Sequence, residues 1–276
     1  MPKGIPMTES SKPLVSVVMA TFNEKPDMVG KAIESILSQT YRNLELFVLD
    51  DSTAEETRNK IDSYSVDSRV HVIREAERMR FVPALNKGLR LATGKYIARM
   101  DGDDISLPER FEKQVAFLEQ NTDIAVLGGQ MNIIDESDVI KSERLYAIND
   151  KAFLKYAIFR NPIAHPTVMF RKELVDNGYL YDENLKRSED LDLWLRLLKA
   201  GYKLRNLDEK LLNYRVLSQQ MKKRGREQWE YNLKIRKHNF TFKYFGFSLC
   251  SVCVSFLYNL IPSFIFEVGY NKENKI

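Results

Sequence analysis

Residues 96–104, YIARMDGDD, join an apolar run to three carboxylates within four positions. The apolar run predicts a β-strand, and the acids follow directly after its end. Carboxylates this close raise one another's pKa unless a cation offsets their charge. A divalent cation with oxygen ligands, bound in turn to a diphosphate, suits such a cluster. The alternative is a turn of solvated acids, or the cap of the helix that residues 107–110 open.

Strands and helices alternate through the first hundred residues. The predicted strands cover residues 14–20, 44–49, 70–74 and 96–100, and the predicted helices cover residues 28–39, 55–64 and 82–92. Alternation of this kind indicates an α/β fold with a parallel sheet. Because the carboxyl ends of parallel strands meet at one edge of a sheet, we expect residues 21–24, 50–51 and 101–104 to converge there.

Beyond residue 108 the alternation loosens. We predict a helix over residues 110–119, a strand at 124–127, a loop leading into a strand over 163–170, and an apolar helix over 191–199. Two short strands are predicted at residues 203–207 and 210–215.

Composition excludes several classes of protein. The chain has 276 residues, 44% of them hydrophobic and 29% charged, which is ordinary for a globular protein. Its two cysteines, Cys250 and Cys253, provide neither a disulfide framework nor a zinc site, and their spacing lacks the strand–helix context of a redox motif. Residues 1–12 are polar, so we expect no cleaved secretory peptide. A reducing, cytoplasmic setting is expected.

The C-terminal part combines positive charge with an apolar segment. Residues 222–243 hold eight Lys or Arg against two Glu, and the twenty-three residues 244–266 carry no charged side chain. That length suffices for a bilayer span. However, Gly246, Asn259, Pro262 and four serines interrupt the segment, which favours an interfacial helix pair on an anionic membrane surface. Packing on the globular domain or in a homodimer stays open.

The motifs at the ends of the predicted strands, together with a later acidic pair, resemble those of the inverting glycosyltransferases of family 2, which have the GT-A nucleotide-sugar fold. The matching pieces are residues 17–24, 35–41, 49–52, 92–97 and 101–104, and Glu189-Asp190 followed by Leu193-Trp194. The resemblance covers most of the chain, residues 14–215. It implies a Rossmann-like α/β fold: a mixed, mostly parallel sheet flanked by helices, with a helical C-terminal tail.

The resemblance also implies a domain organisation. We expect an N-terminal extension over residues 1–13, a GT-A catalytic domain over 14–217, and a basic and apolar membrane-associating tail over 218–276. Within the catalytic domain, residues 14–107 are expected to bind the nucleotide and residues 108–217 the acceptor.

By this resemblance, the nucleotide is bound by Ala20, Thr21, Phe22, Glu24, Asp51, Arg80 and Asp101. Asp51 is expected to accept a hydrogen bond from the uracil N3–H, because a carboxylate is an acceptor. The three residues 20–22 are expected to line the base pocket, and Asp101 to lie beside the ribose or the water shell of the metal. Arg80 is expected to touch the base or the diphosphate, although a surface role for it stays open.

Asp101 and Asp103 form the DxD motif of the resemblance. It implies that Asp103 binds Mn²⁺ or Mg²⁺, which bridges the two phosphates and stabilises the charge of the leaving nucleoside diphosphate. Asp104 is expected to orient the loop or to reach the donor sugar.

Asp190 corresponds to the general base of the family. An inverting displacement needs one carboxylate to take the proton of the acceptor hydroxyl, and the start of a helix favours the ionised form. A plain helix cap is the competing interpretation. Glu189 and His165 are expected near the acceptor, and a role for His165 as a third metal ligand stays open. Trp194 either stacks on a sugar or belongs to the core.

The implied function is metal-dependent, inverting transfer of a hexose or N-acetylhexosamine from a UDP-sugar, with formation of a β-linkage. The expected acceptor is a lipid-linked saccharide, such as an undecaprenyl-diphosphate oligosaccharide in O-antigen or capsule polysaccharide assembly. The enzyme is expected on the inner face of the cytoplasmic membrane. Galactose, glucose and their N-acetyl forms stay open as donor sugars.

Three other classes fit the sequence less well. A sugar-1-phosphate nucleotidyltransferase needs a Gly-rich, basic loop after the first strand to hold a triphosphate, and residues 21–24 are neither Gly-rich nor basic. A non-catalytic, membrane-associated protein has no need for Asp103 together with Asp190. Nucleic-acid binding is not expected, because the basic residues 222–237 adjoin an apolar segment instead of interleaved aromatic residues.

Overall fold

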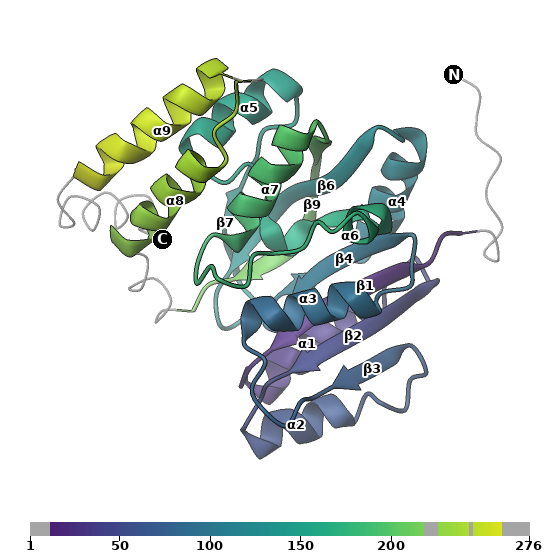
Figure 1. Ribbon diagram of the computed structural model, residues 1–276. Helices are drawn as coiled ribbons and strands as arrows, with labels where there is room; N and C mark the ends of the chain where they lie inside the picture. The colour runs from purple at the N-terminus through teal and green to yellow at the C-terminus, as the bar shows by residue number, and fades with distance from the viewer. Residues whose placement is uncertain (1–11, 218–225, 243–244, 261–276) are drawn as a thin grey trace. The chain divides into compact units, whose positions relative to one another are not determined.

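The computed structural model describes residues 12–217, 226–242 and 245–260, and these divide into two compact units (Figure 1). The first unit contains the described residues up to Thr122 together with Met169–Gly178. The second contains Asp123–Val168 and the described residues from Tyr179 onwards.

The first unit is built around a mostly parallel sheet. Its strands are β1 (Val15–Thr21), β2 (Leu44–Asp50), β3 (Val70–Ile73), β4 (Tyr96–Asp101), β5 (Ile105–Ser106) and β8 (Met169–Arg171). The neighbouring strands run in the order β3-β2-β1-β4-β8, where the first four are parallel and β8 is antiparallel to β4. Both faces of β1 and β2 are buried, which is why these strands are continuous apolar runs.

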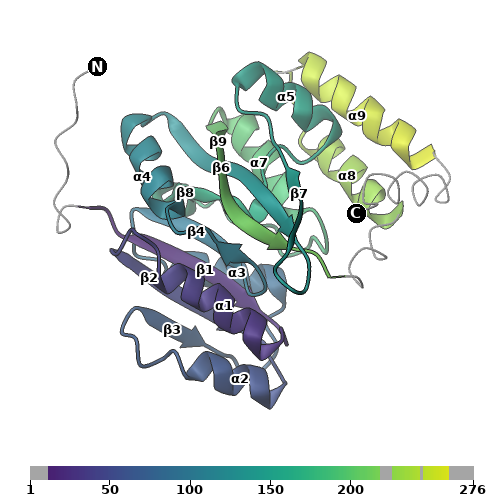
Figure 2. The same ribbon diagram turned by 180° about the vertical axis from the view of Figure 1, so that it is seen from behind.

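Helices cover both faces of this sheet. They are α1 (Pro26–Leu37), α2 (Glu55–Asp62), α3 (Phe81–Leu91), α4 (Arg110–Gln120) and α6 (Lys172–Asp176). The two views show α3 on one face of the sheet and α1 on the other (Figures 1 and 2). Gly88 lets α3 approach β1 closely, since a Cβ at this position would lie 2.5 Å from a methyl carbon of Val18.

The second unit combines three strands with helices. The strands are β6 (Ile124–Ile134), β7 (Ile140–Arg144) and β9 (Lys203–Arg215). The helices are α5 (Asp150–Phe159), the 3-10 turn η2 (His165–Thr167), α7 (Glu189–Ala200), α8 (Arg226–His238) and α9 (Phe245–Leu260). Strand β7 pairs antiparallel with β6, and β9 pairs parallel with β6. The two units thus contain mixed, mostly parallel strands flanked by helices, as the sequence predicts.

Strand β9 differs from the prediction. The sequence predicts two short strands, but the structure has one strand of 13 residues along β6. The pairing register shifts in its middle, where Asn206 lies opposite Gly128 and Lys210 lies opposite Gln130. Residues 207–209 of β9 face only one residue of β6, and two of them are exposed. This irregular stretch interrupts the apolar pattern, which is why the sequence predicts two strands instead of one.

The described part of the C-terminal tail forms α8 and α9. Helix α9 packs beside α8 and α5, and both views show the three together (Figures 1 and 2). Within the described ranges, no helix has both the length and the apolar character that crossing a bilayer requires. Residues 1–11 of the expected N-terminal extension, and residues 218–225, 243–244 and 261–276 of the expected tail, lie outside the described residues.

Candidate active site

Three strand ends of the first unit bring polar residues to one edge of its sheet. Thr21 lies opposite Asp50 in the pairing of β1 with β2, and Ala20 lies opposite Asp101 in the pairing of β1 with β4. The hydroxyl of Thr21 donates to Asp50 at 3.1 Å. The predicted convergence of residues 21–24, 50–51 and 101–104 is therefore observed.

Asp51 is held rigidly at this edge. The backbone N–H groups of Met79 and Arg80 donate to its two carboxylate oxygens at 2.9 and 2.7 Å, and its own N–H donates to the carbonyl of Thr21 at 3.0 Å. Arg80 has a positive φ of 66°, unusual for a residue with a side chain, at the start of α3. Each oxygen of Asp51 keeps a second lone pair, so the fixed carboxylate can still accept a hydrogen bond from a ligand.

A cation–aromatic pair lies beside Asp51. The guanidinium carbon of Arg78 lies 3.5 Å from the ring centre of Phe22, and its Nε lies 3.8 Å from Asp51. The Phe22 side chain is 41% exposed. Arg80, which the sequence predicts at this site, supplies its backbone N–H, whereas Arg78 supplies its side chain, and only the folded loop distinguishes the two arginines. Stacked groups of this kind are suited to bind a planar ring.

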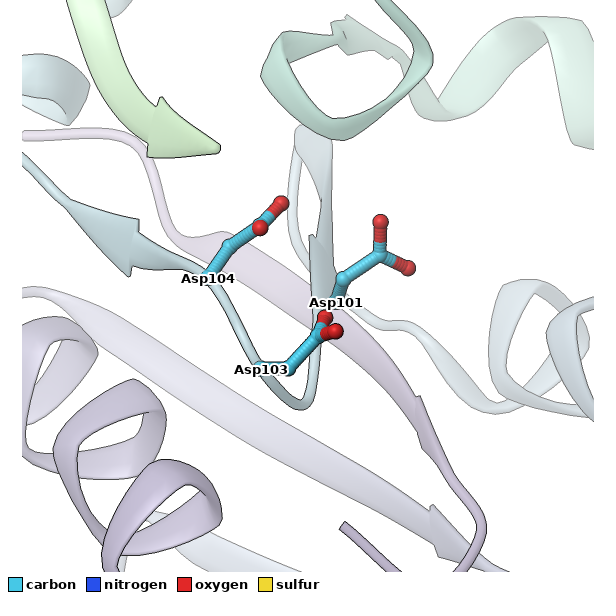
Figure 3. Close-up of side chains that lie close together, drawn as sticks. All are labelled: Asp101, Asp103 and Asp104. Carbon is cyan, nitrogen blue, oxygen red and sulfur yellow. The ribbon is translucent and has the colours of Figure 1, made fainter. Parts of the chain in front are cut away.

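The acidic turn after β4 gathers three carboxylates, which Figure 3 shows extending from one loop. Ligand oxygens of Asp101, Asp103 and Asp104 all lie within 4.8 Å of one another. Asp101 forms an ion pair with Arg99, Asp104 is completely buried, and Asp103 is partly exposed. Oxygen ligands at this spacing fit a hard divalent cation.

A buried positive charge accompanies this turn. Arg110 of α4 is almost completely buried, and its guanidinium donates to Gln114 at 3.1 Å and to the carbonyl of Arg99 at 2.8 Å. Burial, with the nearby charge of Arg99, lowers the pKa of Arg110 to about 9, while Asp104 and Asp101 oppose that shift. The burial of Arg110 was not predictable from the sequence, because nothing near this arginine in the chain distinguishes a buried cation from an exposed one.

Glu24 joins the acidic turn. Burial is the largest cause that raises the pKa of Glu24 to about 7, and the negative charges of Asp103 and Asp101 add to it. The N–H of Phe22 donates to its carboxylate at 2.8 Å. A Cβ at Gly102 would lie 3.2 Å from the carboxyl carbon of Glu24, so glycine permits this close approach. The raised pKa thus comes mainly from burial of the Glu24 carboxyl, and a bound cation would oppose the smaller part that comes from Asp103 and Asp101.

Asp190 lies in the first turn of α7 in the second unit. The side-chain amide of Asn161 donates to one of its oxygens, and the N–H of Leu191 donates to the other at 2.7 Å. The preceding Ser188 has left-handed backbone angles where the helix begins. The carboxylate therefore lies at a helix N-terminus, which favours its ionised form.

His165 belongs to a polar cluster beside α7. Its Nε2 lies 2.8 Å from the hydroxyl of Tyr181, and its Nδ1 lies 3.9 Å from Glu189. Trp194 contacts the edge of the imidazole and has no exposed surface. A buried ring offers no face to a sugar, so Trp194 is a packing residue here. In the described ranges, His165 is not part of the acidic group that could hold a metal ion.

Comparison with known proteins identifies the family. Residues 16–178 match the model of glycosyl transferase family 2. The chain belongs to this family. The glycosyltransferase is 37% identical to putative glycosyltransferase EpsE of Bacillus subtilis over 78% of each chain. It is 37% identical to the O-antigen biosynthesis glycosyltransferase WbnJ of Escherichia coli, over 74% of this chain and 80% of that protein.

Solved structures share the fold of this glycosyltransferase. The crystal structure of S. aureus TarS in complex with UDP-GlcNAc matches with a TM-score of 0.63 at 18% sequence identity. The match covers 81% of this chain and 65% of the TarS chain.

The residues named from the sequence of the glycosyltransferase fall into two groups. The first unit brings together Ala20, Thr21, Phe22, Glu24, Asp51, Arg80, Asp101, Asp103 and Asp104. The second unit brings together His165, Glu189, Asp190 and Trp194 around the start of α7.

Proposed function

We propose that this glycosyltransferase is metal-dependent and inverting, and that it transfers a hexose or N-acetylhexosamine from a UDP-sugar to a saccharide acceptor. The observation that carries the proposal is the arrangement at one sheet edge: the fixed carboxylate of Asp51 follows β2, and the acidic turn of residues 101–104 lies at the end of β4, on the other side of β1. Asp51 accepts a hydrogen bond from the nucleobase, and the acidic turn binds the cation that accompanies the diphosphate.

The uracil ring of the donor binds at Asp51 and Phe22. Uracil presents one N–H group between two carbonyls, and a carboxylate already fixed by two backbone donors accepts from it without a further loss of side-chain freedom. Ala20 and Thr21 line the same pocket, and the guanidinium of Arg78 lies over the Phe22 ring. The fold that this chain shares with TarS, which was crystallised with UDP-GlcNAc, supports a UDP-sugar as donor.

The acidic turn holds Mn²⁺ or Mg²⁺ through Asp103. The ion, when bound, neutralises the negative charge that develops on the departing nucleoside diphosphate. In this proposal Asp101, which is paired with Arg99, serves the ribose or the water shell of the metal, and buried Asp104 orients the loop or reaches the donor sugar. Arg80 serves chiefly through its backbone N–H to Asp51.

Asp190 acts as the general base. The carboxylate removes the proton from the acceptor hydroxyl as that oxygen attacks the anomeric carbon, and a β-linkage results from an α-linked donor. Asn161 orients the carboxylate through its side-chain amide. Glu189 and His165 contribute polar groups for acceptor hydroxyls.

The acceptor is a lipid-linked saccharide in the assembly of a surface polysaccharide. The similarity to WbnJ, an O-antigen biosynthesis enzyme, supports this class of pathway. A saccharide carried on undecaprenyl diphosphate is presented at the inner face of the cytoplasmic membrane, so the enzyme works peripherally at that face. The basic residues 222–243 suit anionic lipid.

Calorimetry with a panel of nucleotide sugars tests the proposal. UDP-galactose, UDP-glucose and their N-acetyl forms are titrated into the protein with Mn²⁺ and, separately, with EDTA. We expect at least one UDP-sugar to bind with Mn²⁺ and to lose most of its affinity in EDTA, and GDP-mannose to bind more weakly. Binding of a nucleoside triphosphate in preference to every UDP-sugar would instead support a nucleotidyltransferase.

A further inference from the structure

Helix α9 presents small polar residues inward and large apolar residues outward. Ser248, Ser251 and Ser255 are each 3% exposed or less, on the side that packs against α8 and α5. The hydroxyl of Ser248 bonds the backbone N–H and carbonyl of Thr241 at 3.2 and 3.1 Å, and that of Ser251 donates to the carbonyl of Ser248 at 3.0 Å. Ser248 thus ties the first turn of α9 to the segment before it, and the serine side of the helix is the buried one.

The opposite side of α9 is an apolar surface, which we call the outward face. It consists of Leu249, Cys250, Cys253, Phe256 and Leu257. These positions follow the spacing of a single helix face. Its large side chains are 44% to 60% exposed, and α9 lies at the outer edge of its unit in Figure 1. Exposed apolar side chains clustered on one face mark an interaction surface.

Polar contacts join α8 and the residue after it, Asn239, to the start of α7 and to α5, and α9 packs on α8. Asn232 of α8 bonds the hydroxyl of Ser188 at 2.8 Å, and Asn239 donates to buried Asp192 of α7 at 2.9 Å. Arg236 is buried and donates to the carbonyl of Ala157 in α5 at 2.6 Å. Whatever binds the outward face is therefore fixed relative to the start of α7.

We propose that the outward face of α9 docks on an anionic phospholipid surface, with the helix lying along that surface. The proposal rests on the proposed function and deepens it, because it names the surface that brings the proposed base to a lipid-linked acceptor. A helix with exposed apolar residues on one side and buried serines on the other suits a position along such a surface.

Charge decides between lipid and a second copy of the chain. Lys234 and Lys237 are exposed on α8, the neighbour of α9, and the sequence of residues 222–243 carries a large excess of positive charge. Anionic headgroups complement this charge. A symmetric dimer through the same face would instead bring like charges together.

Vesicle flotation tests the docking. The full chain is mixed with phosphatidylcholine vesicles, with and without phosphatidylglycerol. We expect binding only when phosphatidylglycerol is present, and weaker binding at high salt because salt screens the charges. Combined Leu249→Ser, Phe256→Ser and Leu257→Ser should lower binding at least about tenfold. Lys234→Gln and Lys237→Gln should each lower it about fivefold.

A matched control carries the same number of serines elsewhere in the second unit. Val139, Ile140 and Leu145 at β7 are 50% to 60% exposed, and their replacement by serine should leave vesicle binding unchanged. Equal loss in both variants overturns the proposal, as does no loss in the α9 variant. Static light scattering on the same proteins tests whether a second copy of the chain binds this face instead. If the α9 variant abolishes a dimer but still binds vesicles, the proposal is also overturned.

A fluorescent probe gives a second readout that needs no destabilising change. The two cysteines of the chain both lie on the outward face, so Cys253 can be labelled in a Cys250→Ser variant with a polarity-sensitive dye. Its emission should shift to the blue with phosphatidylglycerol vesicles, whereas a dye on Val66→Cys in a chain lacking both cysteines should not respond. An unshifted Cys253 probe contradicts the proposal. Neither readout uses a donor sugar or a metal. A failure of vesicle docking therefore does not contradict the proposed transferase activity, and a failure of that activity does not contradict vesicle docking.

Discussion

The side-chain amide of Asn161 donates a hydrogen bond to the carboxylate of Asp190, across 29 positions of sequence. The N–H of Leu191 holds the second oxygen. If Asp190 is the base, Asn161 is its positioning residue, because an amide donor fixes the carboxylate without taking its charge.

Asn161→Ala should lower kcat by roughly a hundredfold, since a misoriented base costs about that much, and should leave the KM for the donor unchanged. Steady-state kinetics with a soluble acceptor analogue measure both constants. Asn184→Ala, at an exposed asparagine of the same unit, is the control and should leave both constants unchanged. An unchanged kcat in Asn161→Ala refutes the positioning role.

Asp103→Ala should abolish the metal-dependent part of UDP affinity. The reason is the loss of an oxygen ligand from a turn whose other carboxylates are an ion-paired Asp101 and a buried Asp104. Calorimetric titration of UDP with and without Mn²⁺ gives the difference directly. Asp27→Ala, an exposed acid of the same unit, should preserve it. Retention of Mn²⁺-dependent affinity in Asp103→Ala shows that the metal binds elsewhere.

Arg110→Met should lower the free energy of unfolding by about 1–3 kcal/mol. The substitution leaves the buried Gln114 side chain and the carbonyl of Arg99 without the hydrogen bonds that the guanidinium donates. Urea denaturation followed by circular dichroism measures this loss. Exposed Arg90→Met is the control, with an expected change within about 0.5 kcal/mol. A loss below about 1 kcal/mol for Arg110→Met means that the buried charge is not integral to the turn.

Glu24 should make the metal-free protein less stable as pH rises. Its pKa is about 7 in the folded protein, above the ordinary value of 4.5, so the folded state binds the proton more tightly than the unfolded chain. This stabilising contribution is complete below the ordinary value and is lost as pH rises through about 7. Unfolding in EDTA over this range should show the loss, and Glu24→Gln should remove it. An identical pH dependence in the variant assigns the effect to another group.

The strand ends were predictable because two simple patterns coincide there. Largely apolar runs mark β1, β2 and β4, and each run stops where polar residues such as Thr21, Asp50 and Asp101 begin. In parallel strands, that coincidence forces the polar residues to one edge.

The supporting residues were not predictable, because their roles depend on distant contacts. Arg78, Arg110 and Asn161 carry ordinary side chains in ordinary surroundings of sequence, and only the fold places them beside Phe22, Arg99 and Asp190. Helix α9 is a related case. Its serines look like interruptions of an apolar segment, yet they form the buried side and the apolar residues form the exposed one.

The stereochemistry of the product shows whether the enzyme inverts the anomeric configuration, as a displacement with Asp190 as the base requires. The protein is incubated with Mn²⁺, a UDP-α-sugar identified by calorimetry and a lipid-diphosphate saccharide analogue, and the anomeric protons of the product are recorded by NMR. We predict release of UDP and a β-linked product, and loss of at least about a hundredfold in rate for Asp190→Asn with UDP binding preserved. An α-linked product, or full activity in Asp190→Asn, contradicts the account.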